Sequence, residues 1–352
     1  MTLYWEGQEH KEGYRMNELD DYKEEIIEKI AVEYPALRNS RLSEFKQIFG
    51  GADTTIYGFD LISDSKSIPL ILRIYRPAFS DSAMREFRVL QNLHAEGIGV
   101  PRPYLCNENS DATGRAYIIM ERIEGPLLSD ELFASQSKPR FNQLLKSFVG
   151  NLIEIHSLDW TKAFTFLDRY DITENPHLFF TYELAGPKKK LADHRVDALS
   201  PLIDWLEANQ TKLREPCLLH SDYHAMNILV RNENELVTID WGNAKLGDFR
   251  HDLGFAVMTL NSTGFDLKEK MVSLYESVSG KKVKNLEYFM VLSSLWNLLR
   301  IYSCVFDHRI TGENEETAKL FTIEYRNYSR YVVRTTQETT GVSMSELLEV
   351  LK

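Results

Sequence analysis

Two short motifs contain carboxylate and amide side chains whose spacing would let them take part in catalysis or metal binding. H-S-D-Y-H-A-M-N contains Asp222 and, five positions later, Asn227, and I-D-W-G contains Asp240, thirteen positions further on. The segments N-I-L-V and L-V-T-I-D-W are strand-like, and the polar run R-N-E-N-E between them is a turn signal. A hairpin of this length predicts that Asp240 folds back beside Asn227.

Three oxygen-bearing side chains in this order indicate phosphoryl transfer. The Asp222 carboxylate can accept the proton of an acceptor hydroxyl. Asn227 and Asp240 offer the hard oxygen ligands that Mg²⁺ prefers when it bridges nucleotide phosphates. The alternative is that both aspartates are ordinary loop carboxylates. It is less favoured because the histidine, the apolar strand, the hairpin and the second motif occur together and in order.

The segments before residue 121 predict a small antiparallel sheet. Strand-like runs alternate with a glycine turn, the polar turn S-D-S-K-S and a loop of Asn, Ser, Asp and Gly. Helical spacing of apolar residues predicts a surface helix at 17–34 and a second helix from 81 to 96. The expected strands are 43–49, 54–62, 68–75, 104–107 and 115–120.

After Glu121 the pattern becomes mainly helical. E-G-P at 124–126 is expected to be a linker, residues 140–157 form an amphipathic pattern, and helical patterns extend from 251 to 352. Polar residues interrupt the apolar stretch Phe289–Phe306, so we expect a buried core helix there and not a membrane span. The chain is therefore predicted to be an α+β protein.

With these elements in order, the sequence resembles the aminoglycoside phosphotransferase and choline kinase-like superfamily, which is related to the protein kinases. The resemblance covers roughly residues 40–305. It implies a bilobal protein-kinase-like fold. A small lobe at 1–123 contains an antiparallel β-sheet that binds nucleotide, and a larger, mainly helical lobe at 124–352 contains the catalytic loop and the substrate site.

The resemblance gives each residue of the two motifs a role. Asp222 is the catalytic aspartate, and Asn227 and Asp240 are the Mg²⁺ ligands. His220 is the structural histidine of the catalytic loop. Asp252, in the later run G-D-F-R-H-D-L-G, is expected to brace that loop and not to react.

The resemblance also implies phosphate-binding residues in the small lobe. F-G-G-A-D-T-T-I-Y is similar to the phosphate-covering loop of these kinases, where glycine amides and threonine hydroxyls can contact phosphate. Arg73, in L-I-L-R-I-Y-R-P, stands where protein kinases have a phosphate-binding lysine, and Glu86, in M-R-E-F-R-V-L, is the matching position for its partner. The alternative is that Arg73 and Glu86 are separate surface charges. The loop residues concerned are Gly50, Gly51, Thr54 and Thr55.

The segment Y-I-I-M-E-R-I-E-G resembles the hinge of the same family. Its apolar strand end is expected to press on the adenine, and backbone groups of Glu121 and Ile123 to hydrogen-bond the edge of the base. The implied cofactor is Mg²⁺, with ATP or GTP as the co-substrate. The expected partners are this nucleotide and a small hydroxyl-bearing substrate.

The function implied is that of an ATP- or GTP-dependent phosphotransferase, a small-molecule kinase that moves the γ-phosphate to a hydroxyl, as aminoglycoside phosphotransferases do. A choline or ethanolamine, homoserine or sugar kinase of the same superfamily is an alternative, and a non-catalytic nucleotide-binding protein is a second one. A protein kinase is disfavoured. Asp252 follows Gly242 by only ten positions, and no A-P-E-like segment follows Asp240.

Composition narrows the list of partners. Lys and Arg number 41 against 52 Asp and Glu, a net charge of −11, which disfavours a nucleic-acid backbone or an anionic membrane as the main partner. The 3 cysteines are far apart and form no C-x-x-C, which fits a reducing compartment. The N-terminal segment lacks the apolar core of a signal peptide. We therefore expect a cytoplasmic protein, as a monomer or homodimer.

Overall fold

The computed structural model describes residues 16–48, 54–63, 66–110, 113–135, 137–168, 171–172, 174–213, 215–232 and 235–352. These form two compact units. The first falls within Met1–Lys138 together with Met226–Asn243, and the second within Pro139–Ala225 together with Ala244–Lys352. The predicted lobes ended and began at residues 123 and 124, whereas here the Asn227–Asp240 segment belongs with the first unit.

An antiparallel sheet forms the centre of the first unit, as the strand pattern predicts. Its order is β1-β3-β4-β6-β5, with β2 also paired to β3. The expected strand at 43–49 is wrong in detail, because only its part at Lys46–Ile48 is a strand, β2, and a separate short strand, β1, precedes it at Arg41–Leu42. The bounds are β1 Arg41–Leu42, β2 Lys46–Ile48, β3 Thr54–Ile62, β4 Ser67–Tyr75, β5 Pro103–Asn107 and β6 Tyr117–Glu121.

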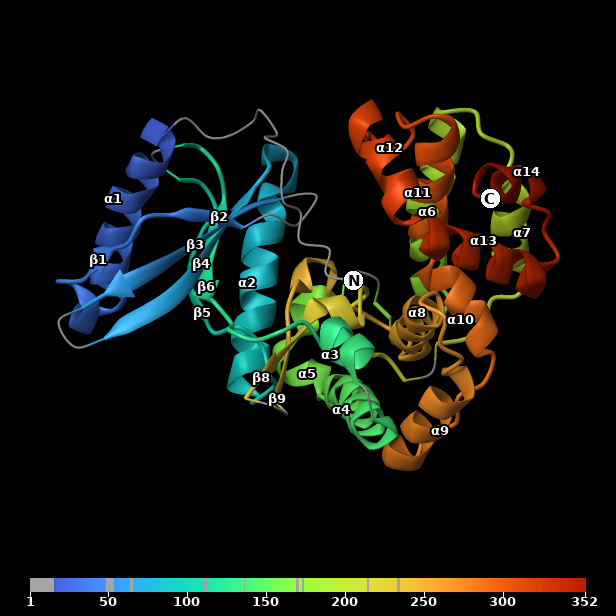
Figure 1. Ribbon diagram of the computed structural model, residues 1–352, viewed down its shortest axis with the longest axis horizontal. Coiled ribbons are helices and arrows are strands. Elements are labelled where there is room, and N and C mark those ends of the chain that lie inside the picture. Colours follow the sequence, from blue (N-terminus) through green and yellow to red (C-terminus); the bar gives the residue numbers. More distant parts are fainter. Residues whose placement is uncertain are drawn as a thin grey trace. The chain divides into compact units, whose positions relative to one another are not determined.

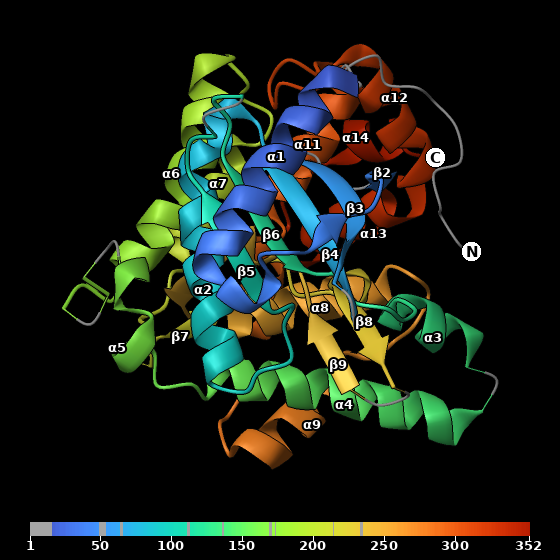
Figure 2. The same cartoon turned by 90° about the vertical axis from the view of Figure 1, so that its left-hand side faces the viewer.

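Two helices flank this sheet on opposite faces, α1 Met16–Glu33 and α2 Ser80–Ala95 (Figure 1). Figure 2 shows α1 lying across the sheet. Tyr22, Ile26 and Ile30 of α1 are at most 2% exposed and pack in the same core cluster as the inward side chains of β3 and β4. The prediction of an amphipathic surface helix at 17–34 is therefore confirmed, and its apolar face completes the core of the sheet.

A hairpin also belongs to the first unit, formed by β8 Ile228–Arg231 and β9 Glu235–Thr238. Val230 N–H donates to the Pro126 carbonyl at 2.9 Å, and Thr238 N–H donates to the Gly99 carbonyl at 2.8 Å. The expected linker at 124–126 instead runs against β8, next to the short helix α3 Leu128–Ala134.

Two glycines allow this close packing of the hairpin. A Cβ on Gly125 would stand 2.2 Å from the Val230 carbonyl oxygen, and one on Gly99 would stand 2.2 Å from the Leu236 carbonyl oxygen. Gly125 also has a φ of +148°, which L side chains rarely adopt. The hairpin is therefore held between two backbone segments that no larger residue could replace without displacing it.

The second unit is mainly helical, which confirms the predicted contrast between the two parts of the chain. It also contains one small antiparallel pair, β7 Cys217–Leu219 with β10 Lys245–Gly247. Helix α8 packs closely on α10, because Gly254 brings the two backbones together. The helices are α4 Lys138–His156, α5 Trp160–Ala163, α6 Leu178–Asp193, α7 Ser200–Ala208, α8 Arg250–Asn261, α9 Lys268–Ser279, α10 Leu286–Ser293, α11 Leu295–Phe306, α12 Glu315–Glu324, α13 Arg326–Thr340 and α14 Ser345–Val350.

The apolar stretch expected as one helix at 289–306 is divided between α10 and α11. The two helices meet at Ser294 and are bent by 44°. Within the described ranges, no single helix is long and apolar enough to cross a membrane, and this bent pair meets that test on length and composition alone. Most side chains of α10 and several of α11 are buried inside the unit, as a core element requires.

Candidate active site

Arg73, whose side chain is only 14% exposed, contacts two carboxylates in the first unit. Arg73 Nη1 donates to Glu86 Oε1 at 2.9 Å, and Arg73 Nη2 donates to Asp240 Oδ1 at 2.7 Å. These residues lie on β4, on α2 and just after β9. The predicted pairing of Arg73 with Glu86 is therefore present. The alternative of separate surface charges is wrong, because the Glu86 side chain is 1% exposed.

Tyr75 is a further member of this cluster. Its hydroxyl donates to Glu86 Oε2 at 2.5 Å, and it shares a face of β4 with Arg73 because the two are two positions apart. Burial lowers the pKa of Arg73, but the charges of Glu86 and Asp240 outweigh burial and raise it. Burial and then the Glu86 charge raise the pKa of Tyr75. Arg73 therefore stays cationic and Tyr75 stays a hydrogen-bond donor.

The hairpin brings the two predicted metal ligands together. Ile239 N–H donates to the Asn227 carbonyl at 2.9 Å, so Asp240 follows directly beside Asn227, as the spacing predicts. Asp240 has a φ of +66°, a left-handed conformation that is uncommon outside glycine. An amide oxygen and a carboxylate are hard donors, and two protein ligands leave room for the phosphate and water oxygens that Mg²⁺ keeps in nucleotide sites. This donor set fits Mg²⁺.

The predicted phosphate-covering loop is only partly placed. Gly50 and Gly51 lie outside the described residues. Thr54 and Thr55 begin β3, where Thr54 pairs with Tyr75 of the arginine strand. The Thr54 hydroxyl is buried with no hydrogen-bond partner among the residues that the structure describes. Contact of these threonines with phosphate stays a prediction.

The predicted hinge comprises β6 and the residues that follow it. The Glu121 N–H donates to the Arg102 carbonyl at 2.9 Å, and the Glu121 carboxylate accepts from Arg231 Nη2 at 2.6 Å. A contact between Glu121 and a base edge would therefore use its carbonyl oxygen. Ile123 lies just beyond the strand. Base recognition by Glu121 and Ile123 stays a prediction.

The predicted catalytic aspartate lies in the second unit, on the loop that follows β7. Asp222 N–H donates to His220 Nδ1 at 3.2 Å, and His224 Nε2 lies 3.5 Å from Asp222 Oδ1. Ser221, between the two, has a φ of +70°. The Asp222 side chain is 33% exposed, so solvent and substrate can reach its carboxylate. The loop therefore presents a carboxylate on a backbone that its contacts hold in place.

Asp252 braces this loop, as predicted. Its two carboxylate oxygens accept the backbone N–H groups of His220 at 2.7 Å and Ser221 at 2.8 Å. His156 Nε2 lies 3.3 Å from the same carboxylate, and His156 Nδ1 lies 3.0 Å from the Tyr275 hydroxyl. Asp252 is fully buried, so these contacts replace water completely.

A chain of buried charges continues from this brace. His251 Nδ1 lies 3.8 Å from Asp252 Oδ1, His251 Nε2 lies 3.4 Å from Glu183, and Lys245 Nζ donates to Glu183 at 2.6 Å. Burial would raise the pKa of Asp252, but the hydrogen bond to His156 and the neighbouring His251 outweigh burial and lower it. Burial would also raise the pKa of Glu183, but Lys245 and His251 lower it to about 2. Both carboxylates therefore remain charged.

Sequence reasoning missed several members of the site. Tyr75 could have been found, because it alternates with Arg73 on one strand. His156 could not, because it ends a helix remote in sequence from Asp252. Tyr328, on α13, was also missed. Burial and then the charge of Asp222 raise the pKa of Tyr328.

This chain matches a known enzyme family and is similar to part of several curated proteins. Residues 44–272 match the model of the phosphotransferase enzyme family. Acyl-CoA dehydrogenase family member 11 of Rattus norvegicus is 26% identical over 259 residues, which are 68% of this chain and 33% of that protein. The Homo sapiens protein of the same name is 22% identical over 250 residues, 65% of this chain and 32% of its own. The chain spans about a third of the length of the curated relatives it matches.

Solved structures resemble the fold at low sequence identity. A Ralstonia eutropha protein provisionally described as an aminoglycoside phosphotransferase has a TM-score of 0.69 and 18% identity, covering 91% of this chain and 99% of its own. Spectinomycin phosphotransferase APH(9)-Ia, solved with ADP and spectinomycin, has a TM-score of 0.57 and 18% identity, covering 90% and 98%. At this identity the likeness establishes the bilobal kinase-like fold.

Proposed function

Because this chain belongs to the phosphotransferase enzyme family, we propose that it transfers the γ-phosphate of ATP or GTP, with Mg²⁺, to a hydroxyl group of a small molecule. The observation that supports this most is the complete residue set. Asn227 and Asp240 stand side by side, Arg73 contacts Asp240, and a separate braced loop presents Asp222. A non-catalytic protein of this fold has no need to keep all three acidic and amide groups.

In this proposal each residue has a separate task. Asp222 orients the acceptor hydroxyl and takes its proton. Arg73, held by Glu86, neutralises phosphate charge through its guanidinium. Asn227 and Asp240 hold Mg²⁺, which supplies charge neutralisation on the phosphate oxygens when bound. Asp252 fixes the backbone of the loop that carries Asp222.

A hydroxyl-bearing acyl group is a second candidate acceptor. The observation that favours it is the name of the curated relatives, acyl-CoA dehydrogenase family members, in which the part similar to this chain is about a third of the protein. Domains joined in one polypeptide often act on related compounds. Hydroxyacyl thioesters therefore belong in any acceptor panel beside aminoglycosides, choline, homoserine and sugars.

Nucleotide binding should depend on Mg²⁺. Asp240 and Asn227 offer only oxygen atoms, which need a cation between them and the phosphate oxygens. Isothermal titration with a non-hydrolysable ATP analogue should give tighter binding in Mg²⁺ than in EDTA. ATP consumption against the acceptor panel then tests the reaction itself, with Asp222→Asn as the inactive control. Equal affinity with and without Mg²⁺ would contradict the metal assignment.

Glu86→Gln should raise the KM for nucleotide by roughly tenfold while the chain stays folded. Glutamine keeps the size of Glu86 and can still accept from Tyr75, but it removes the charge that orients Arg73. Arg73→Gln should have the same effect. Steady-state kinetics with a fixed acceptor measure both, and Glu96→Gln, exposed at the end of α2, is the matched control. If the KM for nucleotide is unchanged in both variants, Arg73 and Glu86 do not take part in phosphate binding.

A further inference from the structure

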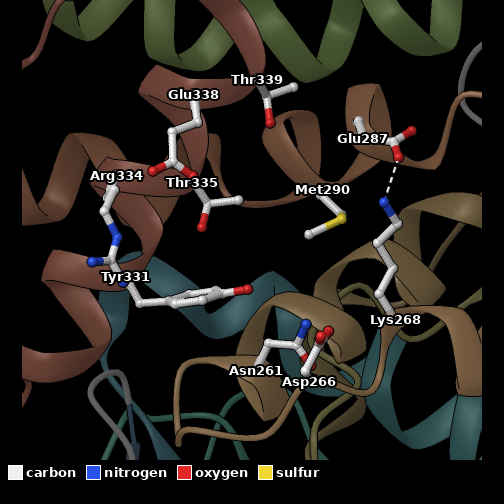
Figure 3. Close-up of a pocket in the computed structure, with 10 residues that line it drawn as sticks. All are labelled: Asn261, Asp266, Lys268, Glu287, Met290, Tyr331, Arg334, Thr335, Glu338 and Thr339. Atoms are coloured by element: carbon white, nitrogen blue, oxygen red, sulfur yellow. Dashed lines mark hydrogen bonds and ion pairs between the residues drawn. The ribbon is translucent and has the colours of Figure 1, made fainter.

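Two adjoining cavities open along helix α13 in the second unit. Their volumes are about 470 and 390 Å³, within the range of small-molecule sites. They share three lining residues, Asn261, Tyr331 and Arg334. In the view of the larger cavity in Figure 3, the Tyr331 ring lies between the Arg334 guanidinium and Lys268.

The two cavities differ in charge. The larger one is lined by three carboxylates, and one of them, Glu287, accepts from Lys268 at 2.6 Å (Figure 3). The smaller one, which we call the arginine cavity, is lined by Arg330 and Arg334 with Asn261, Asn327 and Tyr331, and by no carboxylate. Its charge is therefore opposite in sign to the net charge of −11 of the chain.

The two guanidinium groups are differently engaged. Arg330 Nε and Nη2 donate to the Leu351 carbonyl at 3.0 and 2.6 Å, which fixes this side chain. Arg334 makes no hydrogen bond or ion pair with any residue in the described ranges, although Glu338 is one helical turn away. Its planar group of N–H donors therefore faces solvent and suits a carboxylate or phosphate.

The arginine cavity is within reach of the catalytic loop. Helix α8 links the two. Asp252 in its first turn braces the catalytic loop, and the Phe255 ring lies 6.0 Å, centroid to centroid, from the ring of His224 on that loop. Asn261, which lines both cavities, follows Phe255 by six residues, or about 9 Å along the helix. An acceptor with its hydroxyl at Asp222 can thus extend its other end to Arg334.

We propose that the arginine cavity binds an anionic group of the acceptor, so that the acceptor is a hydroxyl-bearing carboxylate or phosphate ester. This rests on the proposed phosphotransfer and narrows its substrate class. A polycationic aminoglycoside would meet two guanidinium groups here, whereas an anion gains a bidentate partner in Arg334. The larger cavity, with hydroxyl and carboxylate side chains, accommodates the polar remainder of the molecule.

Anion binding is tested on the full chain without any acceptor. Inorganic phosphate should slow the modification of Arg334 by phenylglyoxal several-fold, as measured by peptide mass spectrometry. Arg326, exposed on the same helix but outside both cavities, is the internal control and should react at an unchanged rate. Glucose should protect neither residue. Equal protection of Arg334 and Arg326, or none, overturns the proposal.

The acceptor class is tested with four compounds of one carbon skeleton. With ATP and Mg²⁺, gluconate and glucose 6-phosphate should be used with kcat/KM at least about tenfold above glucose and glucosamine. Whichever of the two anions is preferred identifies the carboxylate or the phosphate as the anionic group. Arg334→Gln should abolish that preference through KM, and Arg326→Gln should preserve it.

The outcomes separate the two proposals. Turnover of glucose or glucosamine that equals turnover of the anions overturns the anionic acceptor and leaves phosphotransfer standing. Protection of Arg334 by phosphate without turnover of any of the four compounds supports the anion site and counts against phosphotransfer to small hydroxyl compounds.

Discussion

Asp222→Asn should lower turnover by roughly 10²–10⁴-fold, or about 3–5 kcal/mol, while nucleotide binding persists. Asparagine keeps the size of aspartate and can still hydrogen-bond, but it cannot take the proton of the acceptor hydroxyl. In the proposal Asn227 and Asp240 hold the metal and Asp222 has no part in that task, so nucleotide binding should persist. Turnover comes from ATP consumption with an identified acceptor, and binding from titration with an ATP analogue and Mg²⁺.

Asp240→Asn is the contrasting variant for this measurement. It removes a charge that Arg73 contacts at 2.7 Å and that the proposed Mg²⁺ site uses, so both binding and turnover should fall. Near wild-type turnover of Asp222→Asn would refute the assignment of the catalytic base. Loss of nucleotide binding in Asp222→Asn would instead place Asp222 in the metal site.

Asp252→Asn should lower the free energy of unfolding by about 3–5 kcal/mol. Both oxygens of this buried carboxylate accept backbone N–H groups of the catalytic loop, and an amide offers one acceptor where two are needed. The change also leaves His156 without the charge it faces. Urea denaturation measures the loss. Asp204→Asn, exposed on α7, is the matched control and should change the midpoint little.

The buried charges also fix how stability depends on pH. Asp252 and Glu183 have lowered pKa values in the folded chain, that of Glu183 to about 2. Their stabilisation is therefore complete above the ordinary carboxyl pKa of about 4 and is lost as the pH falls below it. Burial and Lys245 lower the pKa of His251, but Asp252 and Glu183 outweigh them and raise it. Its contribution is complete below about pH 6.5 and is lost as the pH rises through the raised value.

Because the pKa of Asp252 is lowered, the Asp252→Asn variant should also differ from the wild-type chain in how its stability depends on pH. Between about pH 3 and pH 7 the wild-type chain should lose stability on the acid side, and the variant should lose less because one titrating carboxyl is gone. Urea midpoints across this range measure the difference. An identical acid limb in the two chains would mean that Asp252 is not ionised in the folded state.

The local patterns predicted the sheet and the β8–β9 hairpin well. The apolar run before the turn S-D-S-K-S gave β3 with the bounds Thr54–Ile62, and the polar run before Leu236 gave the turn between β8 and β9. Both elements are specified by residues close in sequence. The pairing of Arg73 with Glu86 came from a family resemblance, because the two residues are 13 positions apart on different elements, β4 and α2.

The features that could not be predicted depend on residues distant in sequence. The apolar spacing predicted helix α1, but the strands that Tyr22, Ile26 and Ile30 cover could not be predicted from it. The glycine at 125 is typical of a linker, but its φ and its contact with Val230 serve packing. Arg73 contacts Asp240, which is 167 positions away in the sequence. Helix and strand periodicity describe only residues close in sequence, so they could not predict this contact.

The hairpin between Gly99 and Gly125 has a consequence for synthesis on the ribosome. The sheet can form once residues up to Lys138 have emerged, but the hairpin that completes the same unit follows only after residues 139–225. At roughly 5–20 residues per second, those roughly 90 residues take roughly 5–18 s to translate. During that interval Arg73 already has Glu86 as its partner, while Asp240 does not yet exist. Until the hairpin has been made, the backbone at both glycines stays uncovered in the nascent sheet. We therefore expect a chaperone to bind the chain most readily during this interval.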